Sequence, residues 1–319
     1  MVAAKFYPLM MDVRNMNFIV STSRTQSFPN KPIPLMQHFS DLAQRYDAFI
    51  IDLWGVLHDG VTAYPGAADC MRQLKKLGKK TLLLSNAPRR ARVVAEGTAK
   101  IGFAPDLYNH IYSSGEETWQ QLKDRRDPWH RRLGEKCLAI VGDSDLNFFE
   151  GLNLKIVQQP DQAEFFLAIG ARHFGEEVKD YEAVLKQALK YSLPMLCVNP
   201  DLEIIRNGKR EICAGALAKC YEELGGEVRY HGKPHPAVYQ EALKLLGNVP
   251  KNKILAIGDA LRTDIMGAQT MGVDSLWILG GIHAESLQLD KPQGLEQRVA
   301  QQCQQAGLSP IAALPKFIW

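Results

Sequence analysis

The sequence has no long hydrophobic run and no strong excess of charge of either sign. No apolar segment reaches the roughly 18 residues that a membrane-spanning helix needs, which argues against a membrane protein of that kind. The 38 basic and 35 acidic side chains leave a net charge of only +3, which gives no support for a nucleic-acid-binding surface. We therefore expect a cytoplasmic protein without a membrane or nucleic-acid partner, and a homo-oligomer is compatible with this composition.

The sequence also lacks paired cysteines. Its six cysteines are widely scattered, and none forms a Cys-x-x-Cys motif. Most of them lie within apolar segments, which favours buried free thiols in a reducing compartment over disulfides. The six are Cys70, Cys137, Cys197, Cys213, Cys220 and Cys303.

The remaining composition is that of an ordinary globular protein. With 319 residues, of which 46% are hydrophobic and 23% charged, the chain is long enough for one large domain or two ordinary ones. Residues 1–35 are predicted to be irregular, because four prolines interrupt them. They lack a sustained amphipathic helix, which disfavours a transit peptide, and Met16 or Met36 could equally be the true start.

Strands and helices alternate along most of the chain. Residues 48–53 and 80–85 have the pattern of buried strands, and helical spacing follows over 67–78 and 88–100. This alternation predicts a doubly wound parallel sheet. A second α/β set is expected between about residues 113 and 228. Its elements are strands at 138–141, 154–157, 164–169 and 194–198 and helices at 181–191 and 214–224.

Polar side chains follow four of the predicted strands where each one ends. The first is Asp52, and the others are Ser85 with Asn86, then Lys233, then Asp259 with Asp264. Ligands bind beyond the carboxyl ends of the strands in open α/β sheets. Singly, each residue could be a loop acid, a helix cap or a surface lysine. Together, their order along the chain favours one site.

This order of motifs resembles the haloacid dehalogenase-like hydrolase superfamily, most of whose members are Mg²⁺-dependent phosphatases. The resemblance covers roughly residues 36–283 and implies a Rossmann-like catalytic core formed by residues 36–112 and 229–319. It also implies an inserted α/β cap domain, residues 113–228, between the second and third motifs, which is the class IIA arrangement. The turn Asn199-Pro200-Asp201 looks like that subclass, to which sugar, nucleotide and cofactor phosphatases belong.

The resemblance also implies a role for each motif residue. Asp52 would be the nucleophile and form an aspartyl-phosphate. Mg²⁺ would be held by Asp52, Asp259 and the backbone carbonyl of Trp54, while Asp264 would bind a metal-bound water or orient Lys233. Lys233 would supply a fixed positive charge, and Ser85 and the backbone of Asn86 would donate hydrogen bonds to the phosphoryl oxygens.

Two features lie in the predicted cap. Residues 140–145 imitate the Asp259 motif, but Phe148 stands where that motif has its second acid. We therefore expect an ordinary cap strand followed by a polar turn. Arg172, with Asn199 and Asp201, is predicted to line the roof of the substrate site, and a solvated loop arginine is the alternative.

Trp54 departs from the family pattern. At this position the family's phosphatases carry a second aspartate, which protonates the leaving group and later activates water. Indole can do neither, because its only polar group is a donor N–H. General acid–base help is typically worth about 10²–10⁴-fold, so slow turnover is expected unless another group serves. His58 and Asp59 are the nearest candidates, although a solvent-facing flap is the simpler interpretation of His58.

The sequence thus predicts a Mg²⁺-dependent phosphatase for a small phosphorylated metabolite, such as a sugar, nucleotide or cofactor phosphate. In that case Trp54 could stack on an aromatic or sugar substrate or pack in the core. The alternative is a catalytically weakened protein that keeps the phosphate and metal site for binding or regulation. A dehalogenase ranks third, because Asp259 and Asp264 imply a metal that halide displacement does not need.

Overall fold

The structure is a computed structural model that describes residues 32–206 and 208–319. Most of the predicted irregular segment, residues 1–35, lies outside the described residues. Its described end runs beside the last strand of the chain, where Met36 donates a backbone hydrogen bond to Ala313. Within the described ranges, no helix combines the length and the apolar character needed to cross a membrane.

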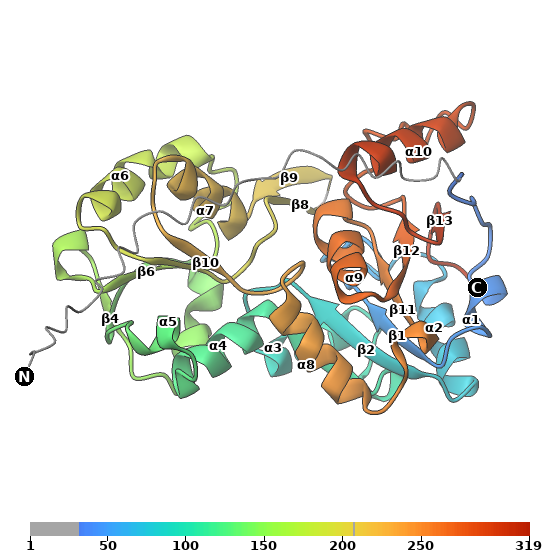
Figure 1. The fold of residues 1–319 in the computed structure, drawn as a ribbon, viewed down its shortest axis with the longest axis horizontal. Coiled ribbons are helices and arrows are strands. Elements are labelled where there is room, and N and C mark those ends of the chain that lie inside the picture. Colours follow the sequence, from blue (N-terminus) through green and yellow to red (C-terminus); the bar gives the residue numbers. More distant parts are fainter. Residues whose placement is uncertain (1–31, 207) are drawn as a thin grey trace, which may run out of the picture. The chain divides into compact units, whose positions relative to one another are not determined.

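A six-stranded parallel sheet has the order β13-β12-β11-β1-β2-β3 (Figure 1). Its strands are β1 (Ala48–Ile51), β2 (Lys80–Ser85), β3 (His110–Ser113), β11 (Ile254–Gly258), β12 (Asp274–Ile278) and β13 (Ala312–Leu314). The helices that accompany it are α1 (Ser40–Ala43), α2 (Ala67–Lys76), α3 (Ala91–Lys100), α8 (Pro236–Leu246), α9 (Met266–Met271) and α10 (Leu295–Ala306). Shorter turns are η1 (Pro105–Leu107), η5 (Lys251–Lys253) and the π-helical η6 (Leu261–Ile265).

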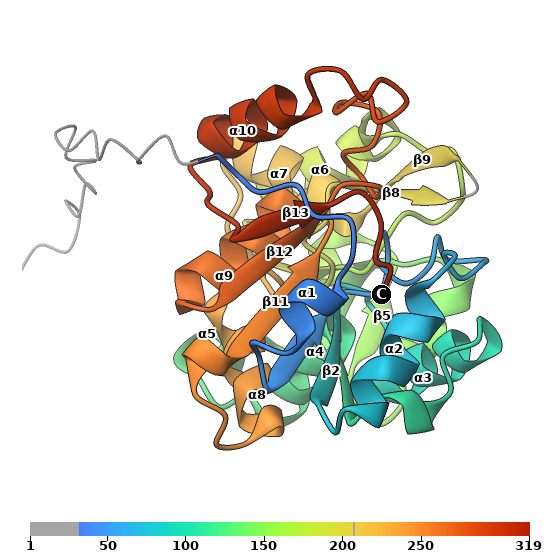
Figure 2. The same ribbon diagram turned by 90° about the vertical axis from the view of Figure 1, so that its right-hand side faces the viewer.

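Both faces of this sheet are apolar and covered by helices. Phe49 and Ile51 of β1 pack with α2, whereas Ala48 and Ile50 point to the opposite face and pack with α8 and α9. Figure 2 shows α8 and α9 on one side of the strands and α2 on the other. Successive strand residues face opposite sides, so an uninterrupted apolar run is what a sheet covered on both faces requires. The predicted doubly wound core is confirmed.

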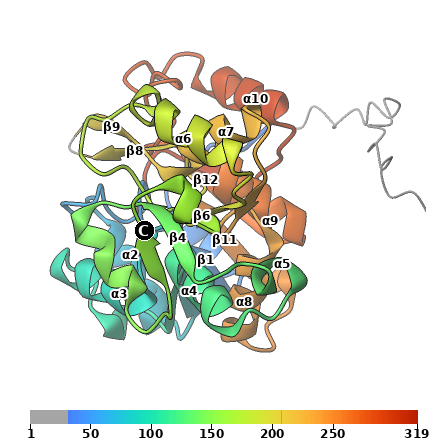
Figure 3. The ribbon, with the colours of Figure 1, turned by 90° about the vertical axis from the view of Figure 1, so that its left-hand side faces the viewer.

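The inserted region forms a second parallel sheet in the order β10-β7-β6-β4-β5. Its strands are β4 (Lys136–Ile140), β5 (Lys155–Val157), β6 (Phe165–Ala168), β7 (Met195–Cys197) and β10 (Val228–Tyr230). Its helices are α4 (Ser114–Asp124), α5 (Pro128–Arg131), α6 (Glu182–Lys190) and α7 (Ala214–Glu223), with 3-10 turns η2 (Asp143–Phe149), η3 (Pro160–Gln162) and η4 (Val178–Tyr181). One sheet face packs with α6 and α7, and α4 contributes to the other (Figure 3).

Several elements differ from the sequence prediction. The strand before Lys233 was expected in the core, but β10 pairs with β7 in the five-stranded sheet. The antiparallel hairpin of β8 (Glu203–Arg206) and β9 (Lys209–Ile212) was not predicted. Its strands read Glu-Ile-Ile-Arg and Lys-Arg-Glu-Ile, without the alternation of polar and apolar residues that predicts a strand. The free thiols are confirmed, because all six cysteines are unpaired and only Cys220 is not fully buried.

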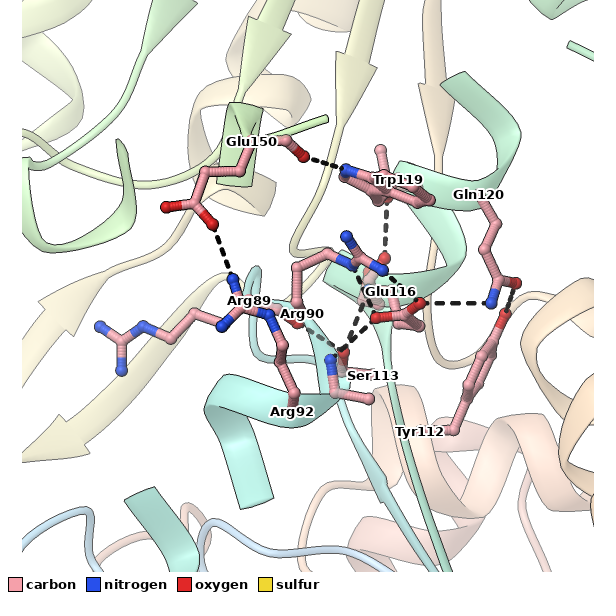
Figure 4. Close-up of polar contacts among 12 residues, drawn as sticks. Arg89, Arg90, Arg92, Tyr112, Ser113, Glu116, Trp119, Gln120 and Glu150 are labelled. Carbon is pink, nitrogen blue, oxygen red and sulfur yellow. Dashed lines mark hydrogen bonds and ion pairs between the residues drawn. The ribbon is translucent and has the colours of Figure 1, made fainter. Parts of the chain in front are cut away.

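A polar network joins α3, which packs on the six-stranded sheet, to α4 of the insert (Figure 4). Arg90 donates two hydrogen bonds to Glu116, of 2.7 and 3.0 Å, and its guanidinium lies 3.6 Å from the centre of the Trp119 ring. Ser113 caps α4 by accepting a hydrogen bond from the backbone N–H of Glu116. A bidentate, partly buried arginine–carboxylate pair holds a defined geometry, so this network fixes where the chain leaves one sheet for the other.

Candidate active site

Asp52 lies directly after β1, and its side chain is buried against Lys233. The Lys233 ammonium is 2.6 Å from Asp52 Oδ1 and 2.7 Å from Asp264 Oδ1, and it donates a 3.0 Å hydrogen bond to the carbonyl of Leu84. An ammonium group has three N–H donors. All three are directed at protein oxygens, so the lysine side chain is held in one orientation.

Lys233 reaches this position from the insert rather than from a core strand. It follows β10 by three residues and precedes α8. The side chain of Asn86 holds its backbone from both sides, because Oδ1 accepts from Lys233 N at 2.7 Å and Nδ2 donates to Lys233 O at 3.0 Å. The predicted neighbourhood of Lys233 and Asn86 is therefore present, but Asn86 uses its side chain to position the lysine.

Three carboxylates converge beside this lysine. Oxygen atoms of Asp52, Asp259 and Asp264 all lie within 4.8 Å of one another. Asp259 follows β11, and its Oδ2 accepts a 2.7 Å hydrogen bond from the backbone N–H of Ile282. Asp264 lies in the π-helical turn η6 and accepts a 3.1 Å hydrogen bond from Ala260 N. π-Helical turns are frequent at functional sites, and here the turn brings the fifth residue after Asp259 back to the same point.

Glycines leave the space that these acids occupy. A Cβ on Gly281 would lie 1.9 Å from Asp259 Oδ2, and one on Gly55 would lie 2.0 Å from the same atom. A Cβ on Gly258 would lie 2.1 Å from Asp264 Cβ. No side chain tolerates such distances, so the positions of both acids depend on glycine. In the sequence, the signal for Gly281 is the pair of adjacent glycines, Gly280 and Gly281, shortly after β12.

The site is short of positive charge. Burial raises the pKa of Asp52 to about 8, with the Asp264 charge acting in the same direction and Lys233 opposing both. Burial and then Asp52 raise the pKa of Asp259 well above its ordinary value. For Lys233, burial pushes the pKa down, but Asp264 and Asp52 outweigh it and the pKa is raised. Three buried carboxylates facing one ammonium fit a divalent cation that prefers oxygen ligands, because buried charges are paired or coordinate metals.

Two cavities meet at this site. The first, of about 250 Å³, is lined by Asp52, Lys233 and Asp259 and by residues of the insert such as Asp201 and Ile205. The second, of about 510 Å³, is lined by Arg172, Asn199 and Asp201 among others. The three residues predicted to form a substrate roof therefore border one cavity. Asp201 and Trp54 line both cavities.

Trp54 is tied to the insert. Its Nε1 donates a 2.9 Å hydrogen bond to the carbonyl of Ile205 in β8. The indole also fills the space beside Gly60, where a Cβ would lie 2.1 Å from Trp54 Cη2. Its only polar atom is therefore engaged, and the ring is partly buried between the two regions.

His58 and Asp59, the nearest replacements for the missing acid, are both engaged in the loop. His58 is 5% exposed, so the expectation of a solvent-facing flap residue is wrong. Its Nδ1 accepts from Gly60 N at 3.0 Å, and burial lowers its pKa to about 4. Asp59 accepts from the backbone N–H groups of Val61 and Thr62, of which Thr62 does most to lower its pKa. Neither of these two described residues lines the cavity of Asp52.

Ser85 ends β2 beside Asn86 and is buried. Its Oγ accepts a 3.1 Å hydrogen bond from Ala87 N, and among the described residues its hydroxyl proton has no hydrogen-bond acceptor. The imitation motif is located elsewhere. Asp143 follows β4 in the five-stranded sheet and begins the exposed turn η2, as predicted.

Comparisons with known proteins agree with this geometry. A family model described as haloacid dehalogenase-like hydrolase matches residues 49–155, and a second, HAD-hydrolase-like, matches residues 230–305. A 4-nitrophenylphosphatase of Schizosaccharomyces pombe is 26% identical over 282 residues, which cover 82% of this chain and 93% of that protein. Chronophin of Mus musculus is 25% identical over 249 residues, covering 76% and 84%.

A solved structure extends the similarity to the whole described fold. A haloacid dehalogenase-like hydrolase from Brucella suis 1330 matches with a TM-score of 0.76 at 29% sequence identity, over 89% of this chain and all of that one. The two family models together span more than half of the chain; the first includes the beginning of the insert, and the second begins where the insert ends. The chain therefore belongs to the haloacid dehalogenase-like hydrolases, in the phosphatase subfamily IIA.

Proposed function

We propose that this chain is a Mg²⁺-dependent phosphatase that hydrolyses a small phosphorylated metabolite through an aspartyl-phosphate at Asp52. One observation carries the proposal: Lys233 bridges Asp52 and Asp264, with Asp259 beside them, in a buried cluster at the carboxyl ends of β1 and β11. In this scheme residues 36–112 and 229–319 form the catalytic core, and residues 113–228 form the cap. The strand β10 then belongs with the cap sheet, and Lys233 lies on the link between the two.

Asp52 attacks phosphorus because it is the carboxylate that Lys233 holds at the strand end. Asp259, Asp52 and the backbone carbonyl of Trp54 would hold Mg²⁺, with Asp264 next to them. When bound, the cation neutralises the phosphate dianion and so permits attack by an anion. Lys233 offers a second positive charge whose position is already fixed, which is the kind of pre-organised stabilisation that favours a charged transition state.

Ser85 and the backbone of Asn86 are suited to the phosphoryl oxygens. The hydroxyl proton of Ser85 is free, and both residues lie at the end of β2, the neighbour of β1. Arg172 and Asn199 line the larger cavity and would contact the rest of the substrate. A cavity of about 510 Å³ is of the size that small-molecule sites have, so sugar, nucleotide and cofactor phosphates all remain in the substrate class.

Trp54 favours a second candidate function. If no other group replaces the missing acid, the chain would bind phosphate and metal with little turnover and act as a binding or regulatory protein. Relatives argue for turnover, since one is named 4-nitrophenylphosphatase. 4-Nitrophenyl phosphate is an aryl phosphate, and its leaving group needs little protonation.

Phosphate release with and without Mg²⁺ separates the two functions. A panel should contain 4-nitrophenyl phosphate, sugar phosphates and nucleotides, with Asp52→Asn as the inactive control. We expect Mg²⁺-dependent turnover of at least one member, abolished in Asp52→Asn. Binding of Mg²⁺ and phosphate by calorimetry without turnover would favour the binding protein, and turnover that survives Asp52→Asn would reject Asp52 as nucleophile.

A further inference from the structure

The cavity of Asp52 is lined by two acids that the catalytic cluster does not use, Asp201 and Glu203. Among the described residues that line it, those with titratable groups are Asp52, Tyr64, Asp201, Glu203, Lys233 and Asp259. Asp52, Asp259 and Lys233 form the cluster already described. Glu203 pairs with Arg210, and burial raises the pKa of Tyr64 to about 12, too high for efficient proton transfer near neutral pH. Asp201 is left.

Asp201 is held firmly by its surroundings. Asn86 Nδ2 donates a 2.9 Å hydrogen bond to its Oδ1, and Asn199 Oδ1 accepts its backbone N–H at 3.0 Å. Arg262 donates to the carbonyl of Pro200 and fixes the same turn. Among the described residues, Asn86 supplies the one hydrogen bond to this carboxyl group, so Oδ2 stays available at the cavity wall.

Asn86 connects Asp201 to the nucleophile. The same Nδ2 group that donates to Asp201 also donates to the backbone of Lys233, whose ammonium lies 2.6 Å from Asp52. Asp201 comes from the cap turn and Asp52 from the core sheet, and both line the smaller cavity. A substrate phosphate bound at Asp52 would thus have its ester oxygen directed toward the side of the cavity that the cap supplies.

Trp54 supports this arrangement. Its indole N–H donates to Ile205 O, and Ile205 lies in β8, which begins two residues after Asp201. The side chain that fills the position of the usual acid therefore anchors the segment that carries Asp201. Trp54 thus stands in place of the usual proton-donating aspartate, and its hydrogen bond holds the segment next to Asp201.

We propose that Asp201 is the general acid and base of this enzyme, in place of the aspartate that Trp54 replaces. The inference rests on the proposed phosphatase function. In the first step an Asp52 carboxylate oxygen bonds to phosphorus, the bond from phosphorus to the leaving oxygen breaks with its electron pair, and the leaving oxygen takes the Asp201 proton. In the second step water attacks phosphorus and gives its proton to the Asp201 carboxylate. The Asp52–phosphorus bond then breaks, and both acids return to their first state.

The electrostatics of Asp201 agree with an acid. Burial raises its pKa, and this outweighs the opposing charge of Lys233 and the hydrogen bond from Asn86. A carboxyl group kept protonated nearer neutral pH can donate to a leaving oxygen. An ionised carboxylate would repel a phosphate, which favours a proton-donating role for Asp201 over a role in binding the phosphoryl group.

The test compares leaving groups in Asp201→Asn, which keeps the oxygen that accepts from Asn86. Rapid-quench measurements would follow the first release of leaving group, which reports phosphorylation of Asp52. For an alkyl phosphate we expect this phase to slow by at least about 100-fold. For 4-nitrophenyl phosphate we expect a change below about threefold, because that leaving group needs little protonation. Later turnover of both should fall, since water activation is also lost.

Controls separate this inference from the proposed function. Asp161→Asn, a matched change at an exposed cap acid, should leave both substrates unaffected, and thermal unfolding should show that Asp201→Asn remains folded. An Asp201→Asn enzyme that slows the first phase equally for both substrates, or for neither, would overturn the acid role while leaving the phosphatase intact. A wild-type protein that releases no leaving group from either substrate would instead reject the proposed function.

Discussion

The same short motif ends a strand in each of the two parallel sheets, with opposite results. Gly258 is the last residue of β11 and Asp259 follows it, whereas Gly142-Asp143 comes shortly after the end of β4. Asp259 is 5% exposed and lies beside Asp52 and Asp264. Asp143 is exposed at the start of a 3-10 turn. Thus a glycine and an aspartate after a strand do not by themselves make a site.

The neighbouring strands make the difference. β11 lies next to β1, so Asp259 meets Asp52, and Lys233 bridges Asp52 to Asp264. The neighbours of β4 are β5 and β6, and among the described residues Asp143 does not belong to a group of acids that could hold a metal ion. The carboxyl edge of a parallel sheet is suited to ligands, but its chemistry depends on which strands are adjacent.

Neutralising the two aspartates should produce the largest contrast. Asp259→Asn removes one hard oxygen ligand from a site with excess negative charge, so Mg²⁺ affinity measured by calorimetry should fall at least about tenfold. Mg²⁺-dependent turnover should fall with it. Asp143→Asn is the matched control and should leave the Mg²⁺ affinity unchanged. Equal Mg²⁺ affinity in the two variants would remove Asp259 from the metal site.

Adding a methyl group to the two regions should give the next contrast. In Gly281→Ala the new Cβ would lie 1.9 Å from Asp259 Oδ2, and something must move. In Gly142→Ala the nearest atom, Ala171 O, is 3.2 Å away. We expect Gly281→Ala to lower the free energy of unfolding by about 1–3 kcal/mol and to weaken Mg²⁺ binding. A chemical denaturation curve in which both variants lose the same amount would contradict this packing account.

Histidines near the two motifs should differ in how they couple stability to pH. The pKa of buried His58 is about 4, against about 6.5 in an unfolded chain. Between these values the unfolded state binds more protons, so stability falls as pH drops from about 6.5 to about 4, by roughly 3 kcal/mol for this group. His58→Asn should remove that part of the pH dependence, because the asparagine side chain does not titrate. The amide oxygen can still accept the hydrogen bond from Gly60 N, so the loop should keep its conformation. His173→Asn, at an exposed residue of the cap, should not. Parallel pH–stability curves for wild type and His58→Asn would refute the assignment.

Two tryptophans offer the smallest contrast. Trp54→Phe and Trp129→Phe each remove one indole hydrogen bond, to Ile205 O and to Glu227 respectively. Each should cost about 1 kcal/mol of stability. Only Trp54→Phe should also change catalysis, because only Trp54 tethers the strand that follows Asp201. Identical Michaelis constants and turnover in both variants would show that the tether has no catalytic role.

The sequence was sufficient for the parts of the fold that depend on short-range pattern. Apolar runs located β1, β2 and β11, and the residues that follow them are brought together as expected. It misplaced β10, because a three-residue strand contains no signal for which sheet it joins. Only the observed pairing with β7 shows that Lys233 arrives from the cap side.

Some site features depend on contacts that sequence spacing cannot give. Asn86 links Lys233 to Asp201, and both of these residues lie more than a hundred positions away from Asn86 in the sequence. His58 is buried with its ring packed edge-on beside Trp54, whereas its place in a loop between two glycines suggested exposure. The missing acid at Trp54 was visible in the sequence, but its replacement could be sought only once the cap turn was placed over the cavity.

Asp52 is expected to be phosphorylated during turnover, and trapping of this aspartyl-phosphate is the decisive experiment. The enzyme would be mixed with 4-nitrophenyl phosphate and Mg²⁺, quenched in acid within the first turnover, and digested for peptide mass spectrometry. The account predicts a phosphoryl group on Asp52, absent without Mg²⁺ and in Asp52→Asn, with Asp143 unmodified. Turnover accompanied by phosphorylation of a different residue would contradict it.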